Sequence, residues 1–323
     1  MGLFNYNDIC TAYLSELHTF RPLFQKHFCI RMFRITGDEL YLDRLRSLLR
    51  DELPRKIQKY RYIDTIRNDE IDISETLRAT MLRNPIEKMR VERRKKVFQE
   101  NPKLKLYFEA LSDLSFYLEL KLDQGEFKKE IQEMLMNICN IPWNKELFHE
   151  EYLLAHPVLF VNSLYRIQQA GFNQTLNVLQ EFVLRNFSPS SLLSLEKLYD
   201  QIYVYTHIII NESLFYQQHL THQQTEEFAW IFDFFKKHFQ HFYTKVNLDL
   251  VIEVLLCFRL SGIENHEMEK TAEEYLSKFF DSTKHYLKSD TVATFEDMEH
   301  ANILLLMYLH LPSSFSQIQQ PIL

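Results

Sequence analysis

The most hydrophobic stretch of the chain, residues 247–262, reads NLDLVIEVLLCFRLSG and is apolar on almost every side when drawn as a helix. A helix that is apolar all round is buried all round. Two acids, Asp249 and Glu253, nevertheless lie four residues apart on one face of it. Asn247 and Gly262 are of the residue types that begin and end helices. We therefore predict a buried helix between them, around which the fold is organised.

The end of this stretch has a near-copy far upstream in the chain. Phe-Arg-Leu-Ser-Gly at 258–262 matches Phe-Arg-Ile-Thr-Gly at 33–37. The separation is about 225 residues, or five steps of about 45, which is typical of a helical repeat. Four glycines follow apolar runs at multiples of roughly this spacing: Gly37, Gly125, Gly171 and Gly262. We expect each glycine to end a helix in the left-handed conformation, which glycine adopts at little cost.

Between these turns the hydrophobic pattern alternates between two kinds of helix. One kind precedes each turn and is apolar nearly all round: 22–35, 72–83, 108–123, 157–170, 191–210, 247–261 and 296–310. The other kind follows each turn and carries a charged face: 38–59, 85–99, 126–139, 173–186, 224–243 and 265–286. This alternation predicts an all-α fold, a single helical-repeat domain spanning residues 1–323. We expect six to seven hairpins closed into an α/α toroid, with an open HEAT-like α-solenoid as the alternative.

The composition agrees with an all-α chain and predicts no membrane-spanning segment. Only 5 glycines and 9 prolines occur, too few for the many turns of a β-sandwich or a doubly wound α/β fold. No uncharged apolar run of about 18 residues is present, so no membrane span is expected. The first residues have neither the basic segment nor the cleavable apolar segment of a signal peptide, so none is expected. The four cysteines are dispersed without a CxxC pair, which indicates free thiols in a reducing cytoplasm.

Two segments resemble known families. Residues 33–45, FRITGDELYLDRL, resemble the turns of six-hairpin toroid enzymes, among them the sugar epimerase and glycosidase-like superfamily and the lanthionine cyclases. Residues 196–262 are similar to an uncharacterised family of bacterial toroid-like proteins, through Tyr-Thr-His at 205–207 and the helix at 249–262. That family has an Asp and a Gly in the turn that here reads Asn-Glu-Ser at 211–213. The resemblance implies a bacterial α/α toroid and brings no activity with it.

Polar residues on otherwise apolar helices are the best candidates for a functional site. They form three groups at helical spacing: Asp200, Tyr203 and His207; Asp249 and Glu253; Glu296 and His300. Burial of an unpaired charge is costly, so each group needs a partner or a wet cavity. Four of these seven residues are candidates for acid–base catalysis: His207, Asp249, Glu253 and His300. The remaining three are candidates for substrate binding: Asp200, Tyr203 and Glu296.

The same residues have two other interpretations. They can hydrogen-bond one another and hold adjacent helices together, and we expect Glu253 to lie within hydrogen-bond reach of His207. They can also hold a metal, but no HExxH motif and no paired cysteines support this. No metal and no cofactor is therefore predicted.

Charge is distributed unevenly along the chain. The formal net charge is −7, and Lys and Arg concentrate in the first third of the sequence. The densest basic run, residues 90–96, is expected to be a solvated helix face, and no nucleic-acid binding is expected. The aromatic run at 228–243 is expected to be core, with enough surface left for a protein partner.

Two functions remain open from the sequence. One is an enzyme or binder that acts on a small molecule, sugar or peptide in a central cavity. The other is a non-catalytic interaction protein that holds a partner through an aromatic or charged surface. The sequence does not decide whether the protein is an enzyme.

Overall fold

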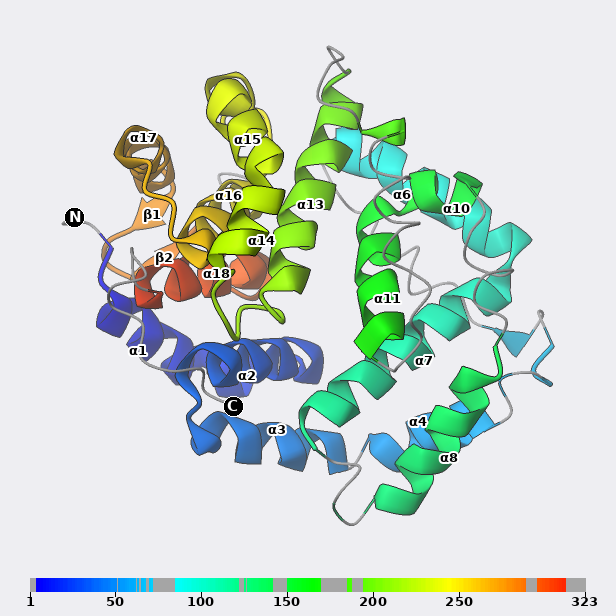
Figure 1. Ribbon diagram of the computed structural model, residues 1–323. Helices are drawn as coiled ribbons and strands as arrows, with labels where there is room; N and C mark the ends of the chain where they lie inside the picture. Colours follow the sequence, from blue (N-terminus) through cyan, green and yellow to red (C-terminus); the bar gives the residue numbers. More distant parts are fainter. Residues whose placement is uncertain are drawn as a thin grey trace. The chain divides into compact units, whose positions relative to one another are not determined.

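A computed structural model describes residues 4–50, 52–61, 63, 65–67, 70–71, 85–121, 125, 127–141, 150–169, 185–187, 194–288 and 295–311 (Figure 1). Apart from one short β-hairpin, the regular structure in these ranges is helical, which confirms the all-α class. The chain divides into two compact units. Unit 1 comprises Met1–Leu49 and Ile208–Leu323, and unit 2 comprises Arg50–His207. Closure into a ring and a single domain stay predictions.

Unit 1 contains most of the helices from both ends of the chain. Its elements are α1 (Tyr6–Glu16), η1 (Leu17–Thr19), α2 (Pro22–Thr36), α3 (Glu39–Arg50, whose last residue lies in unit 2), the end of α13 (Leu195–Glu212), α14 (His222–Glu227), α15 (Ala229–Phe242), α16 (Leu248–Ser261), α17 (His266–Ser277), β1 (Phe280–Asp281), β2 (Tyr286–Leu287), η4 (Glu296–Met298) and α18 (Glu299–His310). Helix α16 packs along α18, which also contacts α1 and α2.

Helix α16 is as buried as its sequence predicts. Every one of its residues except Asp249 is buried, and most of α18 is buried as well. The two helices therefore form the centre of unit 1. Helix α15 covers part of this core with its aromatic face, on which Phe232, Phe235 and Phe239 are buried. The aromatic run is core, as expected.

The repeated turn has the same backbone geometry at both of its copies. Gly37 ends α2 with φ 67°, and Gly262 ends α16 with φ 66°. In each case the glycine N–H bonds back to a helix carbonyl, that of Phe33 or that of Arg259. A residue with a Cβ atom is disfavoured in this left-handed conformation, which explains the glycine at both positions.

The arginine of each repeat also has a similar role. The guanidinium of Arg34 lies 4.9 Å from the ring centre of Phe215, and that of Arg259 lies 4.6 Å from the ring centre of Tyr308. Arg259 additionally donates to the hydroxyl of Tyr308 and pairs with Glu269 at 3.2 Å. These contacts attach α2 and α16 to their neighbours in unit 1.

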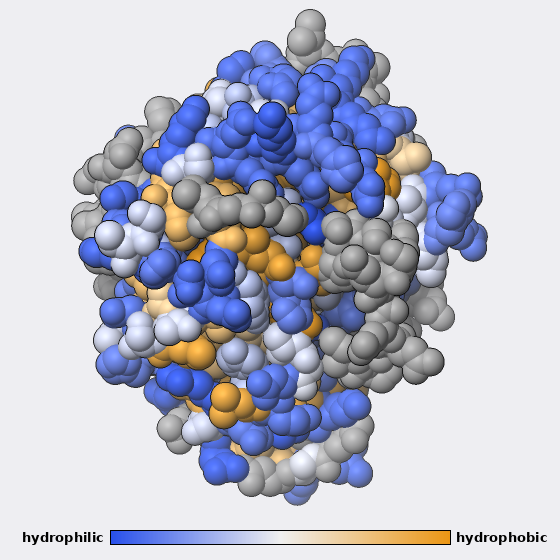
Figure 2. Space-filling model, turned by 90° about the vertical axis from the view of Figure 1, so that its left-hand side faces the viewer, coloured by the Kyte–Doolittle hydropathy of each residue, from blue (hydrophilic) through white to orange (hydrophobic). Residues whose placement is uncertain are grey.

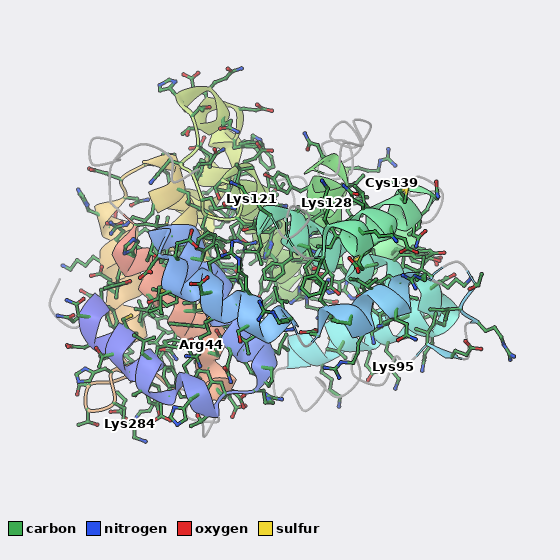
Figure 3. The ribbon with its side chains drawn as sticks, turned by 90° about the horizontal axis from the view of Figure 1, so that it is seen from below. Arg44, Lys95, Lys121, Lys128, Cys139 and Lys284 are labelled. Carbon is green, nitrogen blue, oxygen red and sulfur yellow. The ribbon has the colours of Figure 1, made fainter. Side chains whose placement is uncertain are left out.

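Unit 2 is built from α4 (Leu53–Arg61), α6 (Pro85–Glu100), α7 (Pro102–Glu119), α8 (Lys128–Cys139), α10 (Glu150–Ala155), α11 (Pro157–Gln169) and the first part of α13. Helix α7 contacts α6, α8 and α11, while α10 packs on α6 and α11. The prediction that Gly125 ends a helix is wrong in this unit. Helix α7 ends at Glu119, and Lys121, with φ 56°, takes the left-handed conformation expected of Gly125. Figure 3 labels Lys121 and Lys128 at the two ends of this connection.

Several predicted helices differ from the observed ones. The stretch 38–59 is two helices, α3 and α4, and the stretch 224–243 is divided between α14 and α15. The predicted helix 265–286 ends at Ser277, because β1 and β2 then pair as an antiparallel hairpin. Asp281 holds the hairpin turn by accepting from both Thr283 and Lys284. The predicted helix 72–83, most of 173–186 and Gly171 lie outside the described residues.

The side of the molecule shown in Figure 2 is mainly hydrophilic, with smaller hydrophobic areas between the polar ones. Among the described residues of unit 1, the large hydrophobic ones that remain exposed are Leu14, Leu23 and Leu40. Among the described residues, no helix has both the length and the apolar character needed to cross a membrane.

Candidate active site

The two central helices of unit 1 bring three of the predicted site residues together. Asp249 and Glu253 lie one turn apart on α16, and His300 lies at the start of α18, which packs against it. The Nε2 atom of His300 is 3.4 Å from Glu253 Oε1 and 3.8 Å from Asp249 Oδ2. Only 1% of the Glu253 side chain is exposed, against 38% for His300. A buried carboxylate therefore lies behind an accessible imidazole.

The second ring nitrogen of His300 is available for a ligand. Among the described residues, His300 makes no hydrogen bond through Nδ1. Nε2 is the ring nitrogen nearest to the carboxyl groups of Glu253 and Asp249, so we expect it to carry the proton of the neutral ring. Burial, helped by the positive Arg31, lowers the pKa of His300, which keeps the ring neutral near pH 7. Its Nδ1 atom then carries a free lone pair, as a base requires.

A second histidine lies against the first. The rings of His27, on α2, and His300 stack with their centres 5.3 Å apart. Nδ1 of His27 lies 2.8 Å from Glu299 Oε2, and its Nε2 accepts from Nε of Arg31 at 2.8 Å. Because Arg31 only donates, His27 must carry its proton on Nδ1 and donate to Glu299. Both nitrogens of His27 are therefore engaged, unlike those of His300.

The environment of His27 and Glu299 sets their protonation states. Burial, reinforced by Arg31 and Arg34, lowers the pKa of His27 well below its usual value. Burial raises the pKa of Glu299 to about 7, a rise that the nearby His300 and Arg31 partly oppose. Because that pKa lies near neutrality, Glu299 exchanges its proton in the range where enzymes use acids and bases.

An unusual turn completes the surroundings of Arg31. Leu214, Phe215 and Tyr216 follow α13 and all have positive φ, between 52° and 75°, although none is glycine. The hydroxyl of Ser213 accepts from the N–H of Tyr216 at 2.9 Å and stabilises the turn. The turn places the buried Tyr216 ring 5.4 Å from the Arg31 guanidinium, with its hydroxyl 3.4 Å from Nη1. Arg31 is thereby held between His27 and Tyr216.

The structure thus adds residues that sequence reasoning missed, of which His27, Arg31 and Glu299 are the most important. A signal for two of them exists in the sequence. His27 and Arg31 lie four residues apart in the apolar helix α2, the same spacing as Asp249 and Glu253 on α16.

The other predicted site residues lie elsewhere. Glu296 is in η4, where its Oε1 accepts from the backbone N–H and from Nε of Arg21, at 2.7 and 3.1 Å. The remaining three, Asp200, Tyr203 and His207, belong to α13 in unit 2. The expected pair of Glu253 with His207 joins residues of different units and stays a prediction.

In unit 2, Asp200 and Tyr203 contact the basic run of α6. Arg90 and Arg93 reach Asp200 at 2.8 and 2.6 Å, and the Arg90 guanidinium lies 4.8 Å from the Tyr203 ring centre. Arg90 is buried, so the prediction that the run 90–96 is a solvated face is wrong for this residue. The reason is that Asp200, more than a hundred residues away, neutralises it.

His207 bonds to a neutral partner. Its Nδ1 atom is 3.0 Å from Oδ1 of Asn162 on α11. Within the described part of the chain, no group of three or more His, Cys, Asp or Glu side chains is arranged to hold a metal ion.

The fold and these clusters define an all-α protein with buried ionisable side chains. The chain belongs to the family described as Domain of unknown function (DUF3541), whose model matches residues 4–318. No curated protein and no solved structure matches the chain. The match places the chain in an uncharacterised family and attaches no activity to it, so function is argued from the site alone.

Proposed function

We propose that unit 1 is the catalytic part of an enzyme that moves a proton to or from a small polar molecule at His300. The observation that supports this best is the accessible imidazole of His300, with one nitrogen facing a buried carboxylate and the other free of hydrogen bonds among the described residues. A histidine oriented by a carboxylate is a common general base.

In this proposal the residues have different roles. His300 accepts the proton from a ligand hydroxyl, amine or C–H, or from a water molecule. Glu253 and Asp249 stabilise the imidazolium that forms, because their carboxylates lie within 4 Å of Nε2. His27 is a positioning residue, since both of its nitrogens are engaged and its ring stacks on that of His300.

The ligand class follows from the setting. The site has carboxylates and imidazoles that can hydrogen-bond hydroxyl and amide groups, so a sugar or a peptide suits it. We propose that it binds in the central cavity of a closed helical ring, in a bacterial cytoplasm. The alternative of a protein-binding aromatic surface loses support, because the phenylalanines of α15 are largely buried.

Chemical modification of histidines tests this proposal without a known substrate. Diethyl pyrocarbonate acylates an unprotonated imidazole nitrogen, and mass spectrometry identifies the modified residue. We expect His300 to react more slowly than the exposed reference His266 but much faster than His27, both of whose nitrogens are engaged. Equal protection of His27 and His300 would contradict the free base.

Variants then separate catalysis from a purely structural role. A screen of chromogenic glycosides and peptides supplies the activity, and His300→Gln should abolish it while the melting temperature changes little. Glu253→Gln should lower the activity and change how the activity depends on pH, without unfolding the protein. If both variants instead lower the melting temperature strongly and no substrate is turned over, the residues only hold α16 against α18.

A further inference from the structure

The basic face of α6 in unit 2 has more positive charge than its neighbours neutralise. Arg90 pairs with Asp200, and Arg93 reaches both Asp200 and Glu196, at 2.6 and 3.3 Å. These two carboxylates account for two arginines. A third arginine, Arg94, lies on the same helix and is half-buried.

Arg94 has no acidic partner in the described part of the chain. Its Nε donates to the carbonyl of Arg90 at 3.3 Å, and its Nη1 lies 3.4 Å from Nε2 of His156. Burial, together with the positive Arg90, lowers the pKa of Arg94 to about 10. An arginine stays protonated even then, and although the nearby Asp200 partly offsets its charge, Asp200 forms no ion pair with Arg94.

His156 cannot satisfy the donors that surround it. One of them, the backbone N–H of Leu159 in α11, lies 3.4 Å from Nδ1, and the other is Nη1 of Arg94, next to Nε2. A neutral imidazole has one acceptor nitrogen, so either tautomer leaves an N–H facing another N–H. Burial and the adjacent arginines lower the pKa of His156, so protonation is disfavoured as well.

The surplus of N–H donors around His156 indicates that a hydrogen-bond acceptor is missing. When Nδ1 accepts from Leu159, Nε2 of His156 carries the ring proton and lies 3.4 Å from Nη1 of Arg94, so two donors are adjacent. One oxygen atom can accept from two such donors at ordinary distances of about 2.9 Å. Nε of Arg93 is a further buried donor that lacks an acceptor among the described residues. What would satisfy the adjacent donors of Arg94 and His156 is an acceptor that carries negative charge.

We propose that Arg94 and His156 form a binding site for an oxyanion, the phosphate or carboxylate group of a small ligand. The anion oxygen accepts from Nη1 of Arg94 and from Nε2 of His156, and its charge balances the third arginine. His207 is close enough to His156 to lower its pKa, and its Nδ1 atom bonds to Asn162. The proposal is independent of His300 and of the proton transfer proposed for unit 1.

Thermal unfolding in two anions tests the site and its ligand class. The melting temperature is measured with inorganic phosphate and, separately, with succinate, each against sodium chloride of equal ionic strength. A ligand that binds only the folded state raises the melting temperature. We expect a rise of a few degrees with one of the two anions, and the arm that responds distinguishes a phosphate from a carboxylate ligand. The absence of any rise over chloride in both arms would overturn the proposal.

Matched variants show whether the rise comes from this site. Arg94→Gln should abolish the anion-dependent rise in melting temperature. Lys96→Gln should retain the rise, since Lys96 is exposed on the same helix and its replacement removes the same charge. Without anion, Arg94→Gln should be at least as stable as the parent, because it removes an unpaired charge. If Arg94→Gln does not fold, His156→Gln replaces it and should weaken binding at least tenfold by titration calorimetry. Loss of the rise in Lys96→Gln, or its survival in Arg94→Gln, would refute the site.

Discussion

Two clusters of buried ionisable residues are opposite in charge balance. The direct contacts of the two histidines in unit 1 are with three acidic side chains and one arginine, while Arg34 acts on His27 from nearby; the contacting residues are Asp249, Glu253, Glu299 and Arg31. The cluster of unit 2 has three arginines against two carboxylates: Arg90, Arg93, Arg94, Asp200 and Glu196. Both contain two histidines, and in each cluster burial lowers the pKa of at least one of them.

The difference explains why the two clusters suit different chemistry. An excess of buried carboxyl groups is stabilised when some of them take up protons, so the cluster of unit 1 can exchange protons near neutral pH. Arginine does not release its proton in this range, so an excess of arginine is offset only by an anion. Charge balance, rather than residue type alone, therefore distinguishes a proton-transfer site from an anion site.

Removing the shared carboxylate of unit 2 should have the largest effect. Asp200→Asn removes the carboxylate that the buried Arg90 and its neighbour Arg93 share. Breaking a buried pair from one side typically costs about 3–5 kcal/mol. We expect a loss of this size in the free energy of unfolding, measured by urea denaturation.

The neighbouring Glu196→Gln provides the control for Asp200. Its carboxylate is more exposed and lies 3.3 Å from Arg93, which keeps its bond to Asp200. We expect a loss below about 1 kcal/mol. Equal losses in the two variants would mean that burial of the pair does not matter.

In the acidic cluster of unit 1, removing a charge should instead raise the free energy of unfolding of the protein, and only at high pH. The pKa of Glu299 rises from 4.5 to about 7 on folding, so the folded protein binds an extra proton between these values. The contribution of this carboxyl is full below pH 4.5 and is lost as the pH rises through 7. Glu299→Gln does not titrate, so its advantage over the parent should grow from near zero at pH 4.5 to about 3 kcal/mol above pH 8.

Urea denaturation at pH 5, 7 and 8.5 measures this difference. Glu296→Gln, which removes a carboxylate that pairs with the exposed Arg21, controls for the loss of one negative charge. A stability difference between Glu299→Gln and the parent that is constant across the three pH values would show that Glu299 is not protonated near neutrality.

The sequence was a better guide to α16 and α18 than to their neighbours. An uninterrupted apolar helix with Asp249 and Glu253 one turn apart predicts burial and a polar face, and the structure places His300 against that face. The contact of His27 with Glu299 spans 272 residues, and no local pattern encodes it. The basic run of α6 was misread for the same reason, because burial of Arg90 depends on Asp200, 110 positions away in the chain.

Two other features were not predicted because the residue types at these positions do not indicate the backbone geometry they adopt. The left-handed residues Leu214, Phe215 and Tyr216 are not of the types that favour positive φ, and the contact of Tyr216 with Arg31 helps to hold them there. The hairpin after α17 depends on Asp281 capping its own turn, which competes with continuation of the helix.

The smallest effect concerns the repeated turn of unit 1, which does not recur at the end of α7 in unit 2. Gly37→Ala and Gly262→Ala each place a Cβ atom at a residue with φ near 66°, which costs roughly 1–2 kcal/mol. Gly125→Ala is the matched control in unit 2, because the left-handed position after α7 is already occupied by Lys121. We expect two similar losses in unit 1 and almost none for Gly125, by urea denaturation. A loss at Gly125 as large as at Gly37 would mean that the turn geometry is shared by both units after all.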